Sequence, residues 1–112
     1  MSGIRPIPKN LLIHTVEYRE YQYDERWGDS FAEPVTLEFV RVEPATAMNR
    51  NAIREEITAQ HVLFIDRAHS KPFVQMKEKD RVTFQGQEYE VHRVNPHYAF
   101  GPDPHHLEVE LV

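Results

Sequence analysis

Histidine is the residue type in this chain best suited to chemistry, because imidazole binds metals and exchanges protons near neutral pH. The chain has seven histidines. His105 and His106 are adjacent, and His61, His92 and His97 could approach them in the folded chain. A zinc site needs three or four ligands around one point, whereas neighbouring residues on a regular strand point to opposite faces. The sequence also lacks a His-Glu-x-x-His motif. We therefore predict no metal site, and we expect these side chains to be solvated or hydrogen-bonded.

Other catalytic groupings are equally hard to build from these residues. Acidic pairs such as Glu108 and Glu110 would face solvent from one strand, whereas general acid–base catalysis needs carboxylates that face each other across a cleft. Cysteine is absent, which excludes disulfides, thiol catalysis and cysteine zinc sites. No serine lies in a nucleophile-elbow motif, and four scattered glycines form no phosphate-binding loop. We predict no enzymatic activity and no cofactor.

The composition indicates one small domain that does not bind nucleic acid tightly. The chain has 112 residues, 40% of them hydrophobic and 28% charged, as in an ordinary globular protein. Its 13 basic residues are outnumbered by 18 acidic ones, giving a formal net charge of −5, whereas DNA-binding proteins cluster basic residues. The longest apolar run, Val62–Ile65, is too short to cross a membrane. We expect a single domain over residues 1–112, with residues 1–9 flexible and no membrane contact.

Alternation of apolar and polar residues predicts strands almost throughout. Two of them, joined by Gln85-Gly86-Gln87, have the pattern of a β-hairpin. In Val35–Glu43 the apolar residues change face midway, which indicates either burial on both faces or a β-bulge. The fold class is therefore all-β, a small antiparallel β-barrel of about six strands with long loops and at most one short helical turn. The six predicted strands are Leu11–Tyr21, Val35–Glu43, Ile57–Asp66, Arg81–Phe84, Tyr89–Val94 and Leu107–Leu111.

Three segments are predicted to be loops, because they are rich in proline, glycine or polar residues. They are Asp24–Pro34, Pro44–Glu56 and Asn95–Pro104. Short helical turns could form at Ala52–Glu56 and Lys71–Met76, although both are too short for a stable helix.

Aromatic residues gather around the first of these loops. Acidic residues interleave with them, unlike the basic residues of a stacking platform for single-stranded nucleic acid. Core packing and protein–protein contact both remain open, since tyrosine and tryptophan are common in each. The candidate interface aromatics are Tyr21, Tyr23, Trp27 and Phe31.

Four segments carry a resemblance over about residues 4–112. IRPIPKNLLIHTVEY, EEITAQHVLFID, MKEKDRVTFQGQEYEVHRVNP and HHLEVELV, in this order, resemble minor capsid proteins encoded in the head-to-tail morphogenesis region of tailed phages and prophages. The segments Lys79–Val82 and Gln85–Val91 also resemble the hairpin of head-completion, stopper-like proteins, which are small β-barrels.

The resemblance implies a virion protein of the head–tail junction, made in the bacterial cytoplasm. Such proteins form a ring, typically of twelve copies, below the portal and adaptor, where they retain DNA and offer a docking surface to a tail-completion protein. In stopper-like relatives a long loop points into the channel. The matching positions here are Pro44–Glu56, with Pro44, Met48, Asn49, Arg50 and Arg54 as candidate channel or interface residues in passing contact with DNA.

Other interpretations stay open at this stage. The loop could be solvated, with no gating task. The chain could instead be a generic small β-barrel adaptor that binds a protein or peptide in the cell. A metal-dependent enzyme using the histidines is the third alternative.

Overall fold

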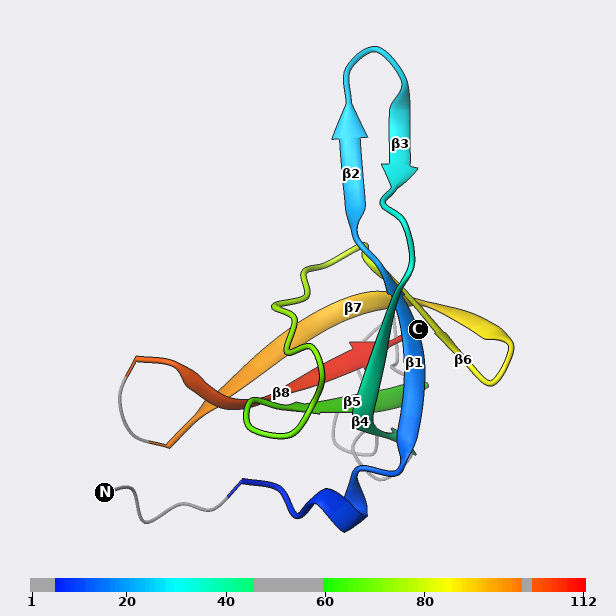
Figure 1. The fold of residues 1–112 in the computed structure, drawn as a ribbon. Helices are drawn as coiled ribbons and strands as arrows, with labels where there is room; N and C mark the ends of the chain where they lie inside the picture. The colour runs from blue at the N-terminus through cyan, green and yellow to red at the C-terminus, as the bar shows by residue number, and fades with distance from the viewer. Residues whose placement is uncertain (1–5, 46–59, 100–101) are drawn as a thin grey trace, which may run out of the picture.

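The computed structural model describes residues 6–45, 60–99 and 102–112, and strands dominate these residues. Six of the strands close into an antiparallel barrel in the order β1-β4-β5-β8-β7-β6, whereas β2 and β3 pair only with each other (Figure 1). The all-β prediction is confirmed, because one 3-10 turn, η1 (Lys9–Leu11), is the only helical element in the described part of the chain. No helix there is long and apolar enough to span a membrane. The strands are β1 (His14–Arg19), β2 (Tyr21–Asp24), β3 (Gly28–Phe31), β4 (Val35–Pro44), β5 (His61–Asp66), β6 (Arg81–Phe84), β7 (Gln87–Tyr98) and β8 (Pro104–Leu111).

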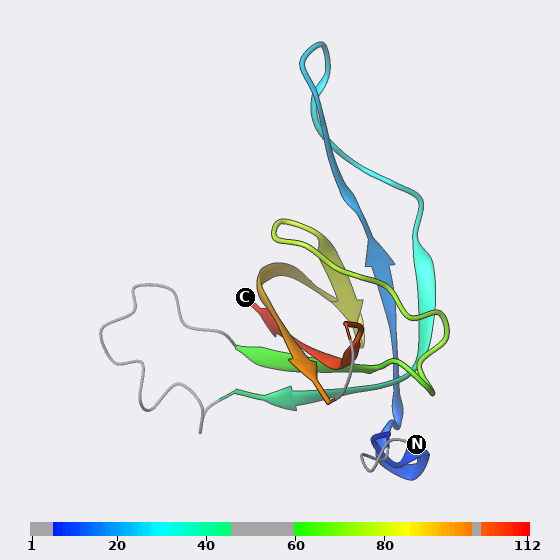
Figure 2. The same ribbon diagram turned by 90° about the vertical axis from the view of Figure 1, so that its left-hand side faces the viewer.

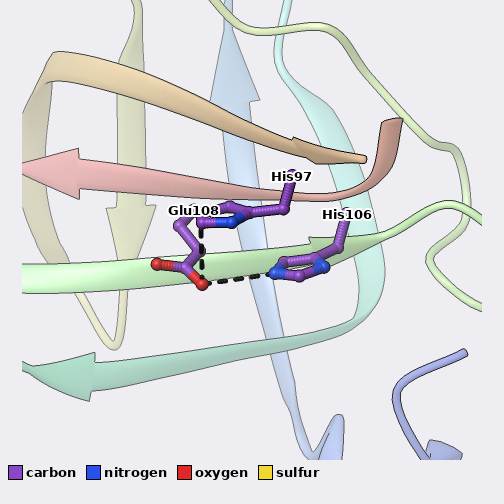
Figure 3. A group of neighbouring side chains, drawn as sticks. All are labelled: His97, His106 and Glu108. Atoms are coloured by element: carbon purple, nitrogen blue, oxygen red, sulfur yellow. Dashed lines mark hydrogen bonds and ion pairs between the residues drawn. The ribbon is translucent and has the colours of Figure 1, made fainter. Parts of the chain in front are cut away.

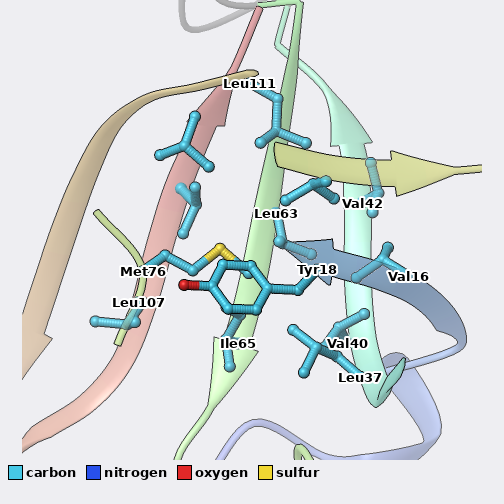
Figure 4. Packing of buried hydrophobic residues seen from close by; sticks show 13 residues of the cluster. Val16, Tyr18, Leu37, Val40, Val42, Leu63, Ile65, Met76, Leu107 and Leu111 are labelled. Atoms are coloured by element: carbon cyan, nitrogen blue, oxygen red, sulfur yellow. The ribbon is translucent and has the colours of Figure 1, made fainter. Parts of the chain in front are cut away.

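The barrel interior is filled by the alternate residues that the sequence pattern assigns to it (Figure 4). In β8, Leu107, Val109 and Leu111 are fully buried, while Glu108 and Glu110 point outward. On β5, Leu63 and Ile65 join the same core, and Val62 packs outside it in a second small cluster. Burial of both faces explains the continuous apolar run in β5, since a strand covered on both sides needs no polar alternation.

A β-bulge explains the change of face in β4. His14 pairs with Val40 and Val16 pairs with Leu37, so β4 has one residue more than β1 between these two pairs. Phe39 lies in this interval with a φ of 60°, a left-handed conformation typical of an irregular strand position. The extra residue turns Val40 and Val42 toward the core that Leu37 already faces. The bulge interpretation is therefore confirmed.

The predicted hairpin at Gly86 is also confirmed. β6 and β7 are joined by two residues, Gln85 and Gly86, with φ angles of 52° and 80°. Two consecutive positive φ angles are typical of a type I′ turn, whose twist matches that of the flanking strands. Gln87 is the first residue of β7 and pairs with Phe84.

Three local predictions are wrong. Asp24–Pro34 is not simply a loop, because it contains the end of β2 and all of β3. Asn95–Tyr98, also predicted as loop, extends β7 and pairs with β8. Pro96 is tolerated there because this part of β7 extends beyond the four-residue β6 and has β8 as its partner. Lys71–Met76 forms no helical turn, and Lys71 instead makes a β-bridge with Glu38.

Candidate functional site

The β2–β3 hairpin projects from the barrel as a separate arm, which we define as Tyr21–Phe31. Figures 1 and 2 show it rising away from the barrel in both views. Its two strands are in register from Tyr21 opposite Phe31 to Asp24 opposite Gly28. A two-stranded ribbon of this length has no core of its own, so its position depends on how its base is attached.

The turn at the end of the arm is formed by its own sequence. The Asp24 carboxylate accepts hydrogen bonds from the backbone N–H of Arg26 at 2.6 Å and of Trp27 at 3.1 Å. Gly28 follows with a φ of 81°, which completes a three-residue hairpin loop. This turn presents the side chain of Trp27 to solvent, with 78% of the residue exposed.

The four candidate aromatics divide into two pairs with different environments. Tyr21 and Phe31 lie at the base of the arm and pack edge to face, with ring centroids 5.8 Å apart. Tyr21 also donates a 2.7 Å hydrogen bond from its hydroxyl to Asp29, and this bond raises the pKa of Tyr21. Tyr23 is 64% exposed and, like Trp27, lies toward the end of the arm. The outer pair thus remains available for contact with another protein.

Two arginines hold the base of the arm against the barrel. The Arg19 side chain donates hydrogen bonds to the carbonyl oxygens of Ala32 at 2.9 Å and Phe31 at 3.3 Å. The Arg81 guanidinium lies 4.6 Å from the centre of the Phe31 ring, within the range of a cation–π contact. The return strand of the arm is therefore tied to both β1 and β6.

A buried carboxylate fixes the point where β1 ends and the arm begins. Asp80 is fully buried and accepts hydrogen bonds from the Tyr18 hydroxyl, the Tyr21 N–H and the Lys77 N–H, each at 2.8 Å. The Lys77 ammonium lies 3.1 Å from the same carboxylate and 3.2 Å from Glu20. Four donors on one carboxylate satisfy a buried charge that would otherwise destabilise the fold.

The same cluster shifts the acidity of two of its members. Burial, together with the hydrogen bond to Asp80, raises the pKa of the Tyr18 hydroxyl far above its ordinary value. Burial lowers the pKa of Lys77, but hydrogen bonds to Asp80 and Glu20 outweigh this effect, so the net pKa is raised. Tyr18 therefore stays neutral and Lys77 stays charged while the arm is in place.

Most of the predicted channel loop lies outside the described residues. Met48, Asn49, Arg50 and Arg54 belong to that undescribed segment, so their role stays a prediction. Pro44 is described, as the exposed last residue of β4 opposite His61. The described residues on either side of the undescribed segment meet, because the N–H of Ala45 donates to the carbonyl oxygen of Gln60 at 3.1 Å.

One cluster of metal-ligand residue types lies on β7 and β8, where Glu108 joins His97 and His106, two of the histidines that were expected to approach each other (Figure 3). His97 and His106 are paired across the two strands, and Glu108 is two residues further along β8. The Glu108 carboxylate lies 3.4 Å from Nε2 of His97 and 3.2 Å from Nε2 of His106. The register of β7 against β8 could not be read from the sequence, because the strand predicted there, Tyr89–Val94, ends before His97.

The chain matches a family model. The model is that of the minor capsid protein family, and it covers residues 8–111. No curated protein and no solved structure matches the chain. The family is a structural one, which agrees with the prediction of a non-enzymatic protein without testing catalysis. Because the match spans nearly the whole sequence, the chain belongs to the minor capsid protein family, a family of structural proteins of the phage virion.

Proposed function

We propose that this minor capsid protein acts at the head–tail junction, as a ring below the portal or adaptor that closes the DNA-filled head and offers the tail a docking surface. The observation that carries the proposal is the arm, which presents Tyr23 and Trp27 to solvent at a distance from the barrel. Exposed aromatics on a projecting element are typical of protein–protein interfaces, where tyrosine and tryptophan are among the residues that contribute most of the binding energy.

The arm suits a ring in which each copy contacts the next. In a head-to-tail interface a projection on one subunit fits a different surface of its neighbour, and repetition closes the ring if the rotation allows. The arm carries three carboxylates, Asp24, Glu25 and Asp29, and one basic side chain, Arg26. We therefore expect the receiving surface, on a neighbouring copy or on the adaptor, to combine an apolar pocket for Trp27 with basic side chains around it.

The charge of the chain also suits a channel for DNA. With a formal net charge of −5, the protein lacks the clustered lysines and arginines that hold phosphates. A junction protein must let DNA slide past during packaging and ejection, and phosphate contacts would slow that movement. We therefore expect the loop at 44–56 to make at most passing contacts with DNA, and its role in obstructing the channel rests on the resemblance to stopper-like proteins alone.

The test is a phage in which this protein carries Tyr23→Ala and Trp27→Ala. A central aromatic contributes about 2 kcal/mol or more to an interface, so losing Trp27 alone should weaken the contact by roughly thirtyfold. After packaging, the heads should lose their DNA and fail to attach tails, and electron microscopy should show empty, tailless heads. Gln22→Ala is the matched control, because Gln22 is an exposed, uncharged and non-aromatic residue of the same arm.

Purified wild-type protein, added to heads that lack it, should restore DNA retention and tail attachment, whereas the double variant should not. Circular dichroism of the double variant should match wild type, because both side chains lie outside the core. If heads without this protein still keep their DNA and join tails, the proposal is wrong.

A further inference from the structure

We propose that His97, His106 and Glu108 form a binding site for a divalent transition-metal ion of the zinc class. The site is independent of the proposed function, since it lies where β7 ends and β8 begins, away from the arm in Figures 1 and 2. The pairing of the two strands creates it. His97 lies directly opposite His106, and Glu108 is two residues along β8, so all three side chains lie on one face of the sheet.

The distances between the ligand atoms suit a small ion. Around tetrahedral zinc, nitrogen and oxygen ligands at about 2.0–2.2 Å are separated from one another by roughly 3.4 Å. The Glu108 oxygen is 3.4 Å from Nε2 of His97 and 3.2 Å from Nε2 of His106. All three ligand atoms lie within 4.8 Å of one another. The rings of His97 and His106 are stacked, with centroids 4.8 Å apart and an angle of 2° between their planes. The His97 side chain is 45% exposed, so binding the ion would require its ring to turn out of this stack toward the two other ligands.

A neighbouring histidine orients one of the ligands. His105 is the extra residue of a β-bulge, because His97 pairs with His106 while the next residue, Tyr98, pairs with Pro104. The bulge brings Nδ1 of His105 to 2.9 Å from Nδ1 of His106, although adjacent strand residues normally point apart. When His106 donates its proton there, its Nε2 is unprotonated and available to a metal. Metal-binding histidines are usually held by such a partner on the other ring nitrogen.

The donor set selects the class of ion. Two imidazoles and one carboxylate occur in many zinc sites, whereas Ca²⁺ and Mg²⁺ prefer oxygen ligands alone. The side chains of His106 and Glu108 are only 18% and 24% exposed, so two of the three ligands are partly shielded from water. Three protein ligands would leave a fourth position on the ion, which a water molecule can fill.

The experiment measures Zn²⁺ binding to tag-free protein near neutral pH, by calorimetry and by competition with a chromogenic chelator. We expect one Zn²⁺ per chain, a higher Tm with Zn²⁺, and no binding of Mg²⁺ or Ca²⁺. Substituting Co²⁺ should give the intense visible absorption of a tetrahedral complex. His97→Ala, His106→Ala and Glu108→Gln should each lower the affinity by about tenfold or more.

His92→Ala is the matched control, because His92 lies on the same strand and outside the cluster. It should bind Zn²⁺ like wild type. Circular dichroism of each variant without metal identifies any that fails to fold, and Glu108→Gln keeps the shape of the side chain. The proposal is overturned if wild type shows no saturable binding of one ion, or if His92→Ala weakens binding as much as the ligand variants do.

Discussion

Replacing Asp80 with alanine should weaken the fold strongly, because this side chain satisfies four donors at the root of the arm. The buried carboxylate accepts from the Tyr18 hydroxyl, the Tyr21 N–H and both the N–H and the ammonium of Lys77. A hydrogen bond to a charged group contributes about 1.5–3 kcal/mol, and a buried donor left unpaired costs about 1–3 kcal/mol. Water can replace the contact of the half-exposed Lys77 ammonium, so that bond counts for little.

The expected loss is therefore about 3–5 kcal/mol of unfolding free energy, similar to breaking a buried ion pair from one side. Asp80→Asn should lose less than Asp80→Ala, because its remaining carbonyl oxygen still accepts. Urea denaturation followed by circular dichroism is the suitable assay. Trp27, the single tryptophan, is exposed in the folded chain, so its fluorescence would report unfolding poorly.

Asp103→Ala is the control, since Asp103 is an exposed carboxylate in the connection before β8. Its effect should stay within about 0.5 kcal/mol. A double-mutant cycle with Tyr18→Phe should show coupling, because both residues share one hydrogen bond. If Asp80→Ala costs no more than Asp103→Ala, the carboxylate does not hold the arm and this reasoning is refuted.

Three further outcomes follow from the barrel. Leu63→Ala, at a fully buried core position, should cost about 2–5 kcal/mol in urea denaturation, and a cost under 1 kcal/mol would contradict the packing described. Gly86→Ala should lower the free energy of unfolding by about 1 kcal/mol. The whole effect should come from the φ of 80°, because no atom lies near enough to clash with an added Cβ. An unchanged Tm would argue against this turn. The raised pKa of Tyr18 means that only the unfolded chain loses this proton just above pH 10, so stability should fall as pH rises past 10.0. Tyr18→Phe should flatten that alkaline decline, and an equal decline in both proteins would show that other groups cause it.

Alternation predicted most of the barrel strands, because burial of one face is a local property of the sequence, whereas β5 was predicted from its continuous apolar run. The change of face in β4 was also visible at Phe39 and Val40, and the pairing of β1 with β4 then decided between burial on both faces and a bulge. The arm was not predicted, because β2 and β3 have four residues each and bury little, so their sequence carries no strong alternation. A signal existed in Asp24 and Gly28, which are typical of a hairpin turn and lie four residues apart.

The complete cluster, in which Glu108 joins His97 and His106, was not predicted, for a different reason. Its members become neighbours only through the pairing of β7 with β8, and register is a long-range property. Pro96 suggested a loop, which removed His97 from the predicted strand. The rule that adjacent strand residues point apart then failed at the bulged His105, whose ring contacts that of His106.

The arm has a consequence for the free protein in solution. The barrel pairs its strands around a closed circle, but in the described structure each strand of the arm has one partner, so two outer edges carry backbone groups with no strand beside them. Such edges can template pairing with another chain and lead to aggregation. Two features limit this hazard: the strands are four residues long, and Asp24 and Asp29 place charge along them. Variants that neutralise these carboxylates would therefore be expected to self-associate before they reach a virion.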